Sequence, residues 1–171
     1  MNKEESIYCK WARVVIESYF NKTEPKISLG SQFFLQKACN VTLYLSDNSI
    51  RGSFGSIFPS KPTLKEEIKS NAISAAFFDS RFNRLKKSEL DNARITIDVF
   101  EEPERIYNIK DLDPHVYGII VSSRQCNSVL MPAIYNINRP EDQVHLAMKK
   151  AGIPLGTSVI IYRFKVNRYE R

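Results

Sequence analysis

An arginine next to two closely spaced glycines, in a segment that otherwise looks like a strand, is the most unusual chemical feature of this sequence. The residues are Arg51, Gly52, Ser53 and Gly55. Glycine weakens a strand, so it is expected where a bulge forms or where another group approaches the backbone closely. An arginine beside such a bare backbone can donate a fork of hydrogen bonds to a carboxylate or phosphate. The alternatives are a bulge that only bends the strand, or an internal ion pair of Arg51, with Asp79 as the candidate partner.

A second group of polar residues lies along and after an alanine-rich helical segment. Asn71 precedes Ala75 by four residues, so it lies on or beside the same helical face and needs hydrogen-bond partners if that face is buried. Asp79 and Arg81 follow where the helix breaks. We expect these two residues to form an ion pair that fixes the loop. A role of Ser53 or Asp79 in proton transfer is the catalytic alternative.

Basic residues after the helix interleave with apolar ones, as they do on some nucleic-acid-binding surfaces. The chain has 25 Lys and Arg against 19 Asp and Glu, a formal net charge of +6. This excess is spread along the chain, and no aromatic stacking platform stands out. We therefore expect nucleic-acid binding to be weak at most. The residues concerned are Arg81, Arg84, Lys86 and Lys87 around Phe82 and Leu85, and Arg163, Lys165 and Arg168 near the end.

Cysteine usage indicates a reducing compartment. The three cysteines, Cys9, Cys39 and Cys126, are far apart and form no CxxC pair. An odd number of dispersed cysteines is typical of reduced thiols and not of a disulfide framework. The first residues lack the apolar segment of a signal peptide, and no apolar run approaches the roughly 20 residues of a membrane span. We expect a cytoplasmic protein that does not enter a membrane.

Candidate metal ligands are few, since the sequence has two histidines. Asp111, Asp113 and His115 lie close together, but their spacing matches no established ligand pattern, and Asp-x-Asp before proline is common in turns. His145 follows Glu141 by four residues, as in an ordinary helical surface pair. We expect no metal and no other cofactor.

The elements that must position these residues follow from hydrophobic periodicity and from turn residues. Alternating strands joined by polar turns indicate two hairpins, and apolar residues three or four apart indicate helices. Helices are predicted from Ile7 to Tyr19, from Thr63 to the break at 79–81 and from Pro140 to Gly152, with a short helical turn at 88–91. Strands are predicted at 41–45, 50–57, 93–100, 116–123, 128–132 and 158–166, with a loop over 101–115.

The ends of two helices carry recognisable signals. Thr63 and Glu66 fit a capping box, Pro140 suits a first helical position, and Gly152 suits a helix end. Strands and helices without a regular β-α-β alternation predict an α+β fold, with mixed or largely antiparallel sheets and packed helices. A length of 171 residues suits a single compact domain spanning 1–171.

Several motifs in a fixed order resemble the AMMECR1 domain, whose hallmark is Leu-Arg-Gly-Cys-Ile-Gly. They are IRGSFGS at 50–56, NAISAAFFDSRF at 71–82, DLDPHVYGIIV at 111–121, LMP at 130–132 and KAGIP at 150–154. The similarity covers nearly the whole chain. It implies an α+β domain of two unequal lobes in which the hallmark motif lines a cleft.

The chain departs from the family pattern where chemistry would be expected. Ser53 stands at the position of the hallmark cysteine, and a serine hydroxyl is a far weaker nucleophile than a thiolate. Tyr117 stands where many relatives have histidine, and Ala133 stands where a polar residue is frequent. These replacements favour binding over catalysis.

We therefore expect a binding or accessory module that holds an anionic small molecule or an acidic peptide segment. The resemblance implies Memo-type or radical SAM proteins as partners. An enzyme acting on a small substrate at the same strand, and a weak nucleic-acid-binding protein, remain as alternatives. The predicted binding residues are Arg51, Gly52, Ser53, Gly55, Asn71, Asp79 and Arg81.

Overall fold

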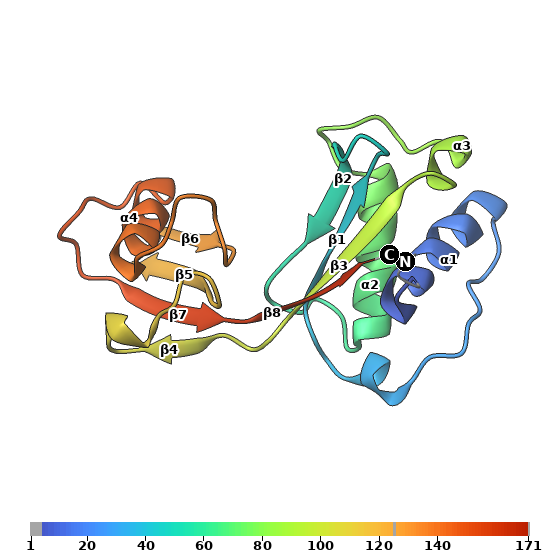
Figure 1. The fold of residues 1–171 in the computed structure, drawn as a ribbon. Coiled ribbons are helices and arrows are strands. Elements are labelled where there is room, and N and C mark those ends of the chain that lie inside the picture. Colours follow the sequence, from blue (N-terminus) through green and yellow to red (C-terminus); the bar gives the residue numbers. More distant parts are fainter. Residues whose placement is uncertain (1–4, 125, 171) are drawn as a thin grey trace. The chain divides into compact units, whose positions relative to one another are not determined.

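The computed structural model describes residues 5–124 and 126–170, and the chain divides into two compact units (Figure 1). Unit 1 comprises residues 1–100 and 167–171, and unit 2 comprises residues 101–166. Both units combine helices with a four-stranded sheet. The predicted α+β class with two unequal lobes is therefore confirmed, whereas the assignment of all 171 residues to one domain stays a prediction.

Unit 1 is built on a sheet with the strand order β2-β1-β3-β8, in which β1 pairs antiparallel with β2 and β3. Helices α1 and α2 pack on one face of this sheet (Figure 1). Alternate strand residues such as Val41, Leu43 and Ile97 are buried against these helices. The elements are α1 (Ile7–Asn21), η1 (Ser31–Phe34), β1 (Cys39–Tyr44), β2 (Ile50–Gly55), α2 (Leu64–Phe77), α3 (Lys87–Leu90), β3 (Arg94–Phe100) and β8 (Val166–Glu170).

Helix α2 begins where its cap predicts. The Thr63 hydroxyl accepts a hydrogen bond from the Glu66 backbone N–H at 3.3 Å and donates to the Glu66 carboxylate at 3.0 Å. The first contact satisfies one of the backbone donors that a helix start leaves unpaired. The predicted Thr63 cap is confirmed. It starts the helix that ends beside Asp79.

Unit 2 is a smaller sheet with the order β4-β7-β5-β6, and α4 packs on β5 and β6. Pro140 occupies the first turn of α4. Gly152 follows its end with a φ of +67°, a backbone conformation that glycine adopts without strain. The elements are β4 (Glu104–Ile106), η2 (Ile109–Asp111), β5 (Gly118–Ser123), β6 (Cys126–Leu130), α4 (Pro140–Lys150) and β7 (Ile160–Phe164).

Two sequence-based predictions are wrong in detail. The predicted loop over 101–115 contains the strand β4, which pairs with β7. The predicted closing strand over 158–166 is two strands, since β7 ends at Phe164 in the unit 2 sheet and β8 begins at Val166 and joins the unit 1 sheet. The chain therefore returns to unit 1 at its end.

Over residues 5–124 and 126–170, none of the helices combines the length and apolar character needed to cross a bilayer.

Candidate functional site

Strands β1 and β2 place three neutral polar side chains together. Thr42 is the direct cross-strand partner of Ser53, and Asn40 is the partner of Gly55. Because Val41 and Leu43 face the helices, Asn40 and Thr42 lie on the opposite face of the sheet. The Ser53 and Thr42 hydroxyl oxygens are 2.9 Å apart, and the Asn40 amide donates to Thr42 at 2.9 Å and to Ser53 at 3.2 Å. We call Asn40, Thr42 and Ser53 the polar cluster.

The residues after α2 attach to the backbone of the same strand. The Ser53 backbone N–H donates to Asp79 Oδ2 at 2.9 Å. Arg81 donates from Nε to Asp79 Oδ1 at 3.0 Å and from Nη2 to Oδ2 at 2.8 Å, so the predicted Asp79–Arg81 pair is confirmed. Ser53 is thereby joined to the helix exit.

The two partners of this pair differ sharply in exposure. The Asp79 side chain is 6% exposed, whereas the Arg81 side chain is 59% exposed. The hydrogen bonds from Arg81, with those from the Ser53 and Arg81 backbone N–H groups, outweigh desolvation and hold the pKa of Asp79 well below its usual range. Asp79 is therefore a stable carboxylate that anchors a largely exposed guanidinium.

Strand β3 continues the polar face beyond β1. Thr96 is the cross-strand partner of Thr42, and Asp98 is the partner of Asn40. Arg168 on β8 donates to both Asp98 oxygens at 2.7 and 2.8 Å. The Thr96 hydroxyl is fully buried and finds no hydrogen-bond partner among the described residues. A buried orphan hydroxyl is costly, so it marks a place where a polar partner would be stabilising.

Arg51 is engaged inside unit 1. Its Nε and Nη2 donate to the two Glu89 carboxylate oxygens at 2.9 and 3.0 Å. Its Nη1 and Nη2 donate to the backbone carbonyls of Asn83 and Arg84 at 2.8 and 3.1 Å. The internal pair that the sequence left open thus exists, but its partner is Glu89 and not Asp79. A ligand-binding role of Arg51 stays a prediction. All three guanidinium nitrogens of Arg51 already donate hydrogen bonds within unit 1.

Gly52 has a packing role. A Cβ atom at this position would collide with the backbone carbonyl of Ala75 in α2. At Gly55, a Cβ atom would fall 2.5 Å from the Asn40 Cα. The two glycines therefore allow close approach of backbone to backbone, as one sequence-based alternative predicts.

Comparison with known proteins decides the family. The AMMECR1 family profile matches residues 9–170. The chain belongs to the AMMECR1 family. It is 41% identical to a protein of Thermotoga maritima over 97% of this chain and 98% of that protein. It is 32% identical to a protein of Clostridium acetobutylicum, of whose length it spans about a third (36%). The crystal structure of an uncharacterised protein from Pyrococcus horikoshii has the same fold, with a TM-score of 0.80 over 96% of this chain and 89% of that one at 24% identity.

In this AMMECR1-family chain, the hallmark cysteine position belongs to the polar cluster. Ser53 occupies it and contacts Thr42 and Asn40 through its side chain. Asn71, also predicted as a binding residue, lies elsewhere. It is buried on the helix side, where its amide donates to the Cys39 backbone carbonyl at 3.0 Å. The structure thus brings Ser53, Asp79 and Arg81 together and leaves Asn71 in the core.

The three cysteines differ in burial. Burial raises the pKa of Cys9 to about 11 and that of Cys39 to about 12, while Cys126 is exposed. Among the described residues, no three His, Cys, Asp or Glu side chains are grouped to hold a metal ion. Two of the basic residues near the chain end are paired with acids, Arg163 with Glu104 and Arg168 with Asp98.

Sequence reasoning missed several members of the AMMECR1 polar face. The sequence does contain a signal for this surface, because polar residues at every second position indicate a polar strand face. Asn40 and Thr42 alternate with apolar residues in this way, as do Thr96 and Asp98. That spacing places each pair on one strand face. It does not show which strands are neighbours, so the surface that these four residues form with Ser53 emerges only from the β2-β1-β3 order.

Proposed function

We propose that this AMMECR1-family chain is a binding module whose polar cluster and Arg81 take a carboxylate from an acidic segment of a partner protein. The observation that most directly supports this proposal is the exposed Arg81 guanidinium. The buried Asp79 carboxylate holds it next to the Ser53 backbone. A guanidinium fixed in this way loses little conformational freedom when it binds an anion.

The donors that Arg81 retains support this role. Its pair with Asp79 uses Nε and Nη2, and Nη1 makes no hydrogen bond with any residue in the described ranges. Hydrogen bonds from a charged donor to a carboxylate are stronger than neutral ones. The negative charge of Asp79 offsets the positive charge of Arg81, so the pair attracts a distant anion only weakly. We therefore expect a modest affinity that depends on direct contact with Arg81.

Exposed aromatic residues support a protein as the ligand. Phe54 and Phe78, the chain neighbours of Ser53 and Asp79, are 47% and 53% exposed. Aromatic and arginine side chains are enriched in protein interfaces. Memo-type or radical SAM proteins are the partners that the family resemblance implies.

The local chemistry favours binding over catalysis at Ser53. The hydroxyl partners of Ser53 are Thr42 and Asn40, and neither side chain is a general base at neutral pH. The nearby Asp79 carboxylate has a lowered pKa and accepts hydrogen bonds on both oxygens. It is therefore a weak base with its lone pairs in use.

Calorimetric titration with an acidic peptide tests the proposal. The probe is an acetylated, amidated hexapeptide of alternating glutamate and leucine, and the same peptide with glutamine for glutamate is its control. We expect millimolar-range binding, on the order of 4 kcal/mol, that Arg81→Gln weakens at least about fivefold. Arg105→Gln, which changes an exposed arginine on β4 in unit 2, should leave it intact. Equal binding of the glutamine peptide, or an unchanged affinity of Arg81→Gln, would contradict the proposal.

A further inference from the structure

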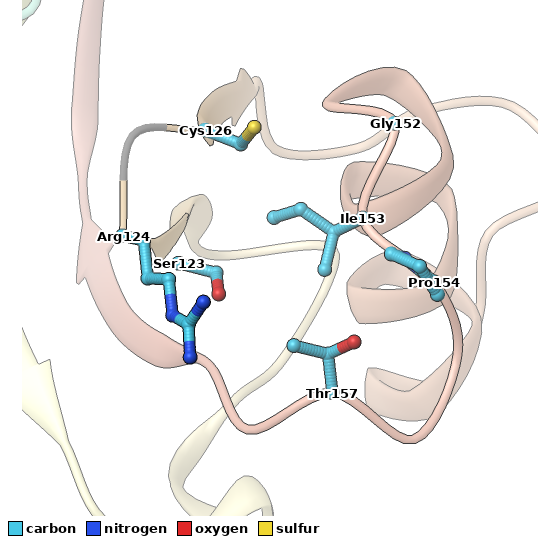
Figure 2. A pocket seen from close by; sticks show the side chains of 7 residues that line it. All are labelled: Ser123, Arg124, Cys126, Gly152, Ile153, Pro154 and Thr157. Atoms are coloured by element: carbon cyan, nitrogen blue, oxygen red, sulfur yellow. The ribbon is translucent and has the colours of Figure 1, made fainter.

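A hollow in unit 2 lies between the adjoining ends of β5 and β6 and the loop that follows α4 (Figure 2). Its volume is about 460 Å³. A second hollow of about 750 Å³ adjoins it and shares Ser123, Arg124 and Thr157 in its lining. Sites for small molecules typically measure about 300–1,000 Å³. The space is therefore sufficient for a small organic ligand.

The lining combines an apolar wall with hydroxyl groups. Figure 2 shows the Ile153 side chain pointing into the hollow, with Pro154 beside it and Thr157 below. Ser123 and Thr157 line both hollows, and Figure 2 shows the Ser123 hydroxyl on the same side of the hollow as Arg124. Predominantly apolar walls with a few placed polar groups are typical of ligand sites.

Arg124 supplies the positive charge. Among the described residues it forms no ion pair, in contrast to Arg51, Arg81, Arg163 and Arg168, which all bind carboxylates. Its backbone has a φ of +48°, the left-handed conformation that is common in a tight hairpin turn such as the one between the paired residues Ser123 and Cys126. The guanidinium is thus available to an anion.

We propose that unit 2 binds a small molecule that carries a phosphate or carboxylate group on an apolar body. Arg124 and the Ser123 hydroxyl hold the anionic group, and Ile153 and Pro154 contact the apolar body. This site belongs to residues 101–166 alone, so it is independent of the acidic segment proposed for unit 1.

Cys126 provides a reporter inside the site. Its thiol lines the hollow, and it is the exposed cysteine of the chain, because Cys9 and Cys39 are buried. The rate at which iodoacetamide alkylates Cys126, followed by mass spectrometry, therefore measures whether the hollow is occupied. The probe is phenyl phosphate, and phenol is the uncharged control with the same apolar body.

We expect phenyl phosphate at ~10 mM to slow alkylation of Cys126 about threefold, as a dissociation constant of about 5 mM gives. Phenol at the same concentration should change the rate little. Arg124→Gln should abolish the protection, while Arg105→Gln, an exposed arginine on β4, should keep it. The ratio of rates with and without probe is compared within each variant. Lack of protection, equal protection by phenol, or unchanged protection in Arg124→Gln would overturn the proposal.

Discussion

At the scale of single residues, the arginine of the hallmark motif acts as a structural clamp. Arg51 joins β2 to the loop and helix at residues 83–89 through Glu89 and two backbone carbonyls. The Arg51 side chain is 12% exposed and that of Glu89 is 27% exposed, so the ion pair between them is partly shielded from water. The exposed charge beside the polar cluster is Arg81, which resides two positions after Asp79. We therefore assign the structural role to Arg51 and the proposed ligand contact to Arg81.

Arg51→Ala should lower the free energy of unfolding by about 2–3 kcal/mol, because Glu89 and two loop carbonyls lose a charged donor. Arg84→Ala, in the same loop but exposed and stacked over Phe78, should cost about 0.5–1 kcal/mol. Urea denaturation of both variants measures the difference. Adding Glu89→Gln to Arg51→Ala should recover part of the loss. A loss for Arg51→Ala no larger than that for Arg84→Ala would show that the clamp is unimportant.

The Asp79–Arg81 pair makes a pH-dependent contribution to stability. The pKa of Asp79 is lowered in the folded state, so its stabilising effect is complete above the unfolded-state pKa of about 3.9 and declines as pH falls below it. The stability difference between the wild-type protein and Asp79→Asn should therefore be largest near neutral pH and shrink between about pH 4 and pH 2. Thermal denaturation across this range measures it. A difference that stays constant with pH would refute the assignment.

Residue types identified part of the candidate site. Asp79 and Arg81 could be predicted because they are two positions apart at a helix end, so a local pair suffices. The partner of Arg51 could not be predicted, since Glu89 is 38 positions away and meets it only when the loop after α2 folds back. Thr96, Asp98 and Arg168 were missed for the same reason, because strand neighbours are set by topology.

At the scale of elements, the contact of α2 with β2 depends on one missing side chain. The Ala75 carbonyl occupies the space that a Cβ atom of Gly52 would need. Helix α2 therefore lies closer to β2 than a residue with a side chain at position 52 would allow. The position of Asp79, just after this helix, depends on that approach.

Gly52→Ala should destabilise the protein by about 2–4 kcal/mol, because a rigid backbone group must move to accept the methyl group. Gly30→Ala is the matched control. A Cβ atom there would meet the flexible Gln32 side chain, and its φ of −71° suits any residue, so the cost should stay within about 0.5 kcal/mol. Chemical denaturation compares the two variants. Equal stabilities would contradict the close-packing role of Gly52.

The elements themselves were largely predictable where they are long and periodic. Helices α1, α2 and α4 and strands β2, β3 and β5 lie close to their predicted positions. Strand β4, which pairs with β7, was missed because it is three residues long and mostly polar. So short a segment shows no alternation of apolar and polar residues that would predict a strand. The break between β7 and β8 was missed because apolar and basic residues continue through it, while the strand changes from one sheet to the other.

At the scale of the whole molecule, unit 1 is discontinuous in sequence. Strand β8 comes from the end of the chain and completes the sheet begun by β1, β2 and β3. Arg168 on this strand pairs with Asp98, whose side chain is 5% exposed. Closure of unit 1 therefore requires that the chain pass through unit 2 first.

Truncation after Val166 should destabilise unit 1 by about 3 kcal/mol or more, because it removes an edge strand and leaves the buried Asp98 carboxylate without its partner. Arg168→Ala in the full chain should produce a smaller part of this loss, since the strand remains. Circular dichroism during thermal unfolding compares the three proteins. A truncated protein that unfolds at the wild-type temperature would show that β8 contributes nothing to unit 1.

The central claim is that Arg81 and the polar cluster bind a carboxylate, and NMR of the ¹⁵N-labelled protein tests it most directly. The glutamate–leucine hexapeptide is titrated while the Arg81 Nε–H signal and the backbone amides of Thr42 and Ser53 are observed. Concerted, saturable shifts of these three signals are predicted, with no response of the Arg51 Nε–H signal. Shifts at Arg51 or elsewhere, with Arg81, Thr42 and Ser53 unchanged, would contradict the claim.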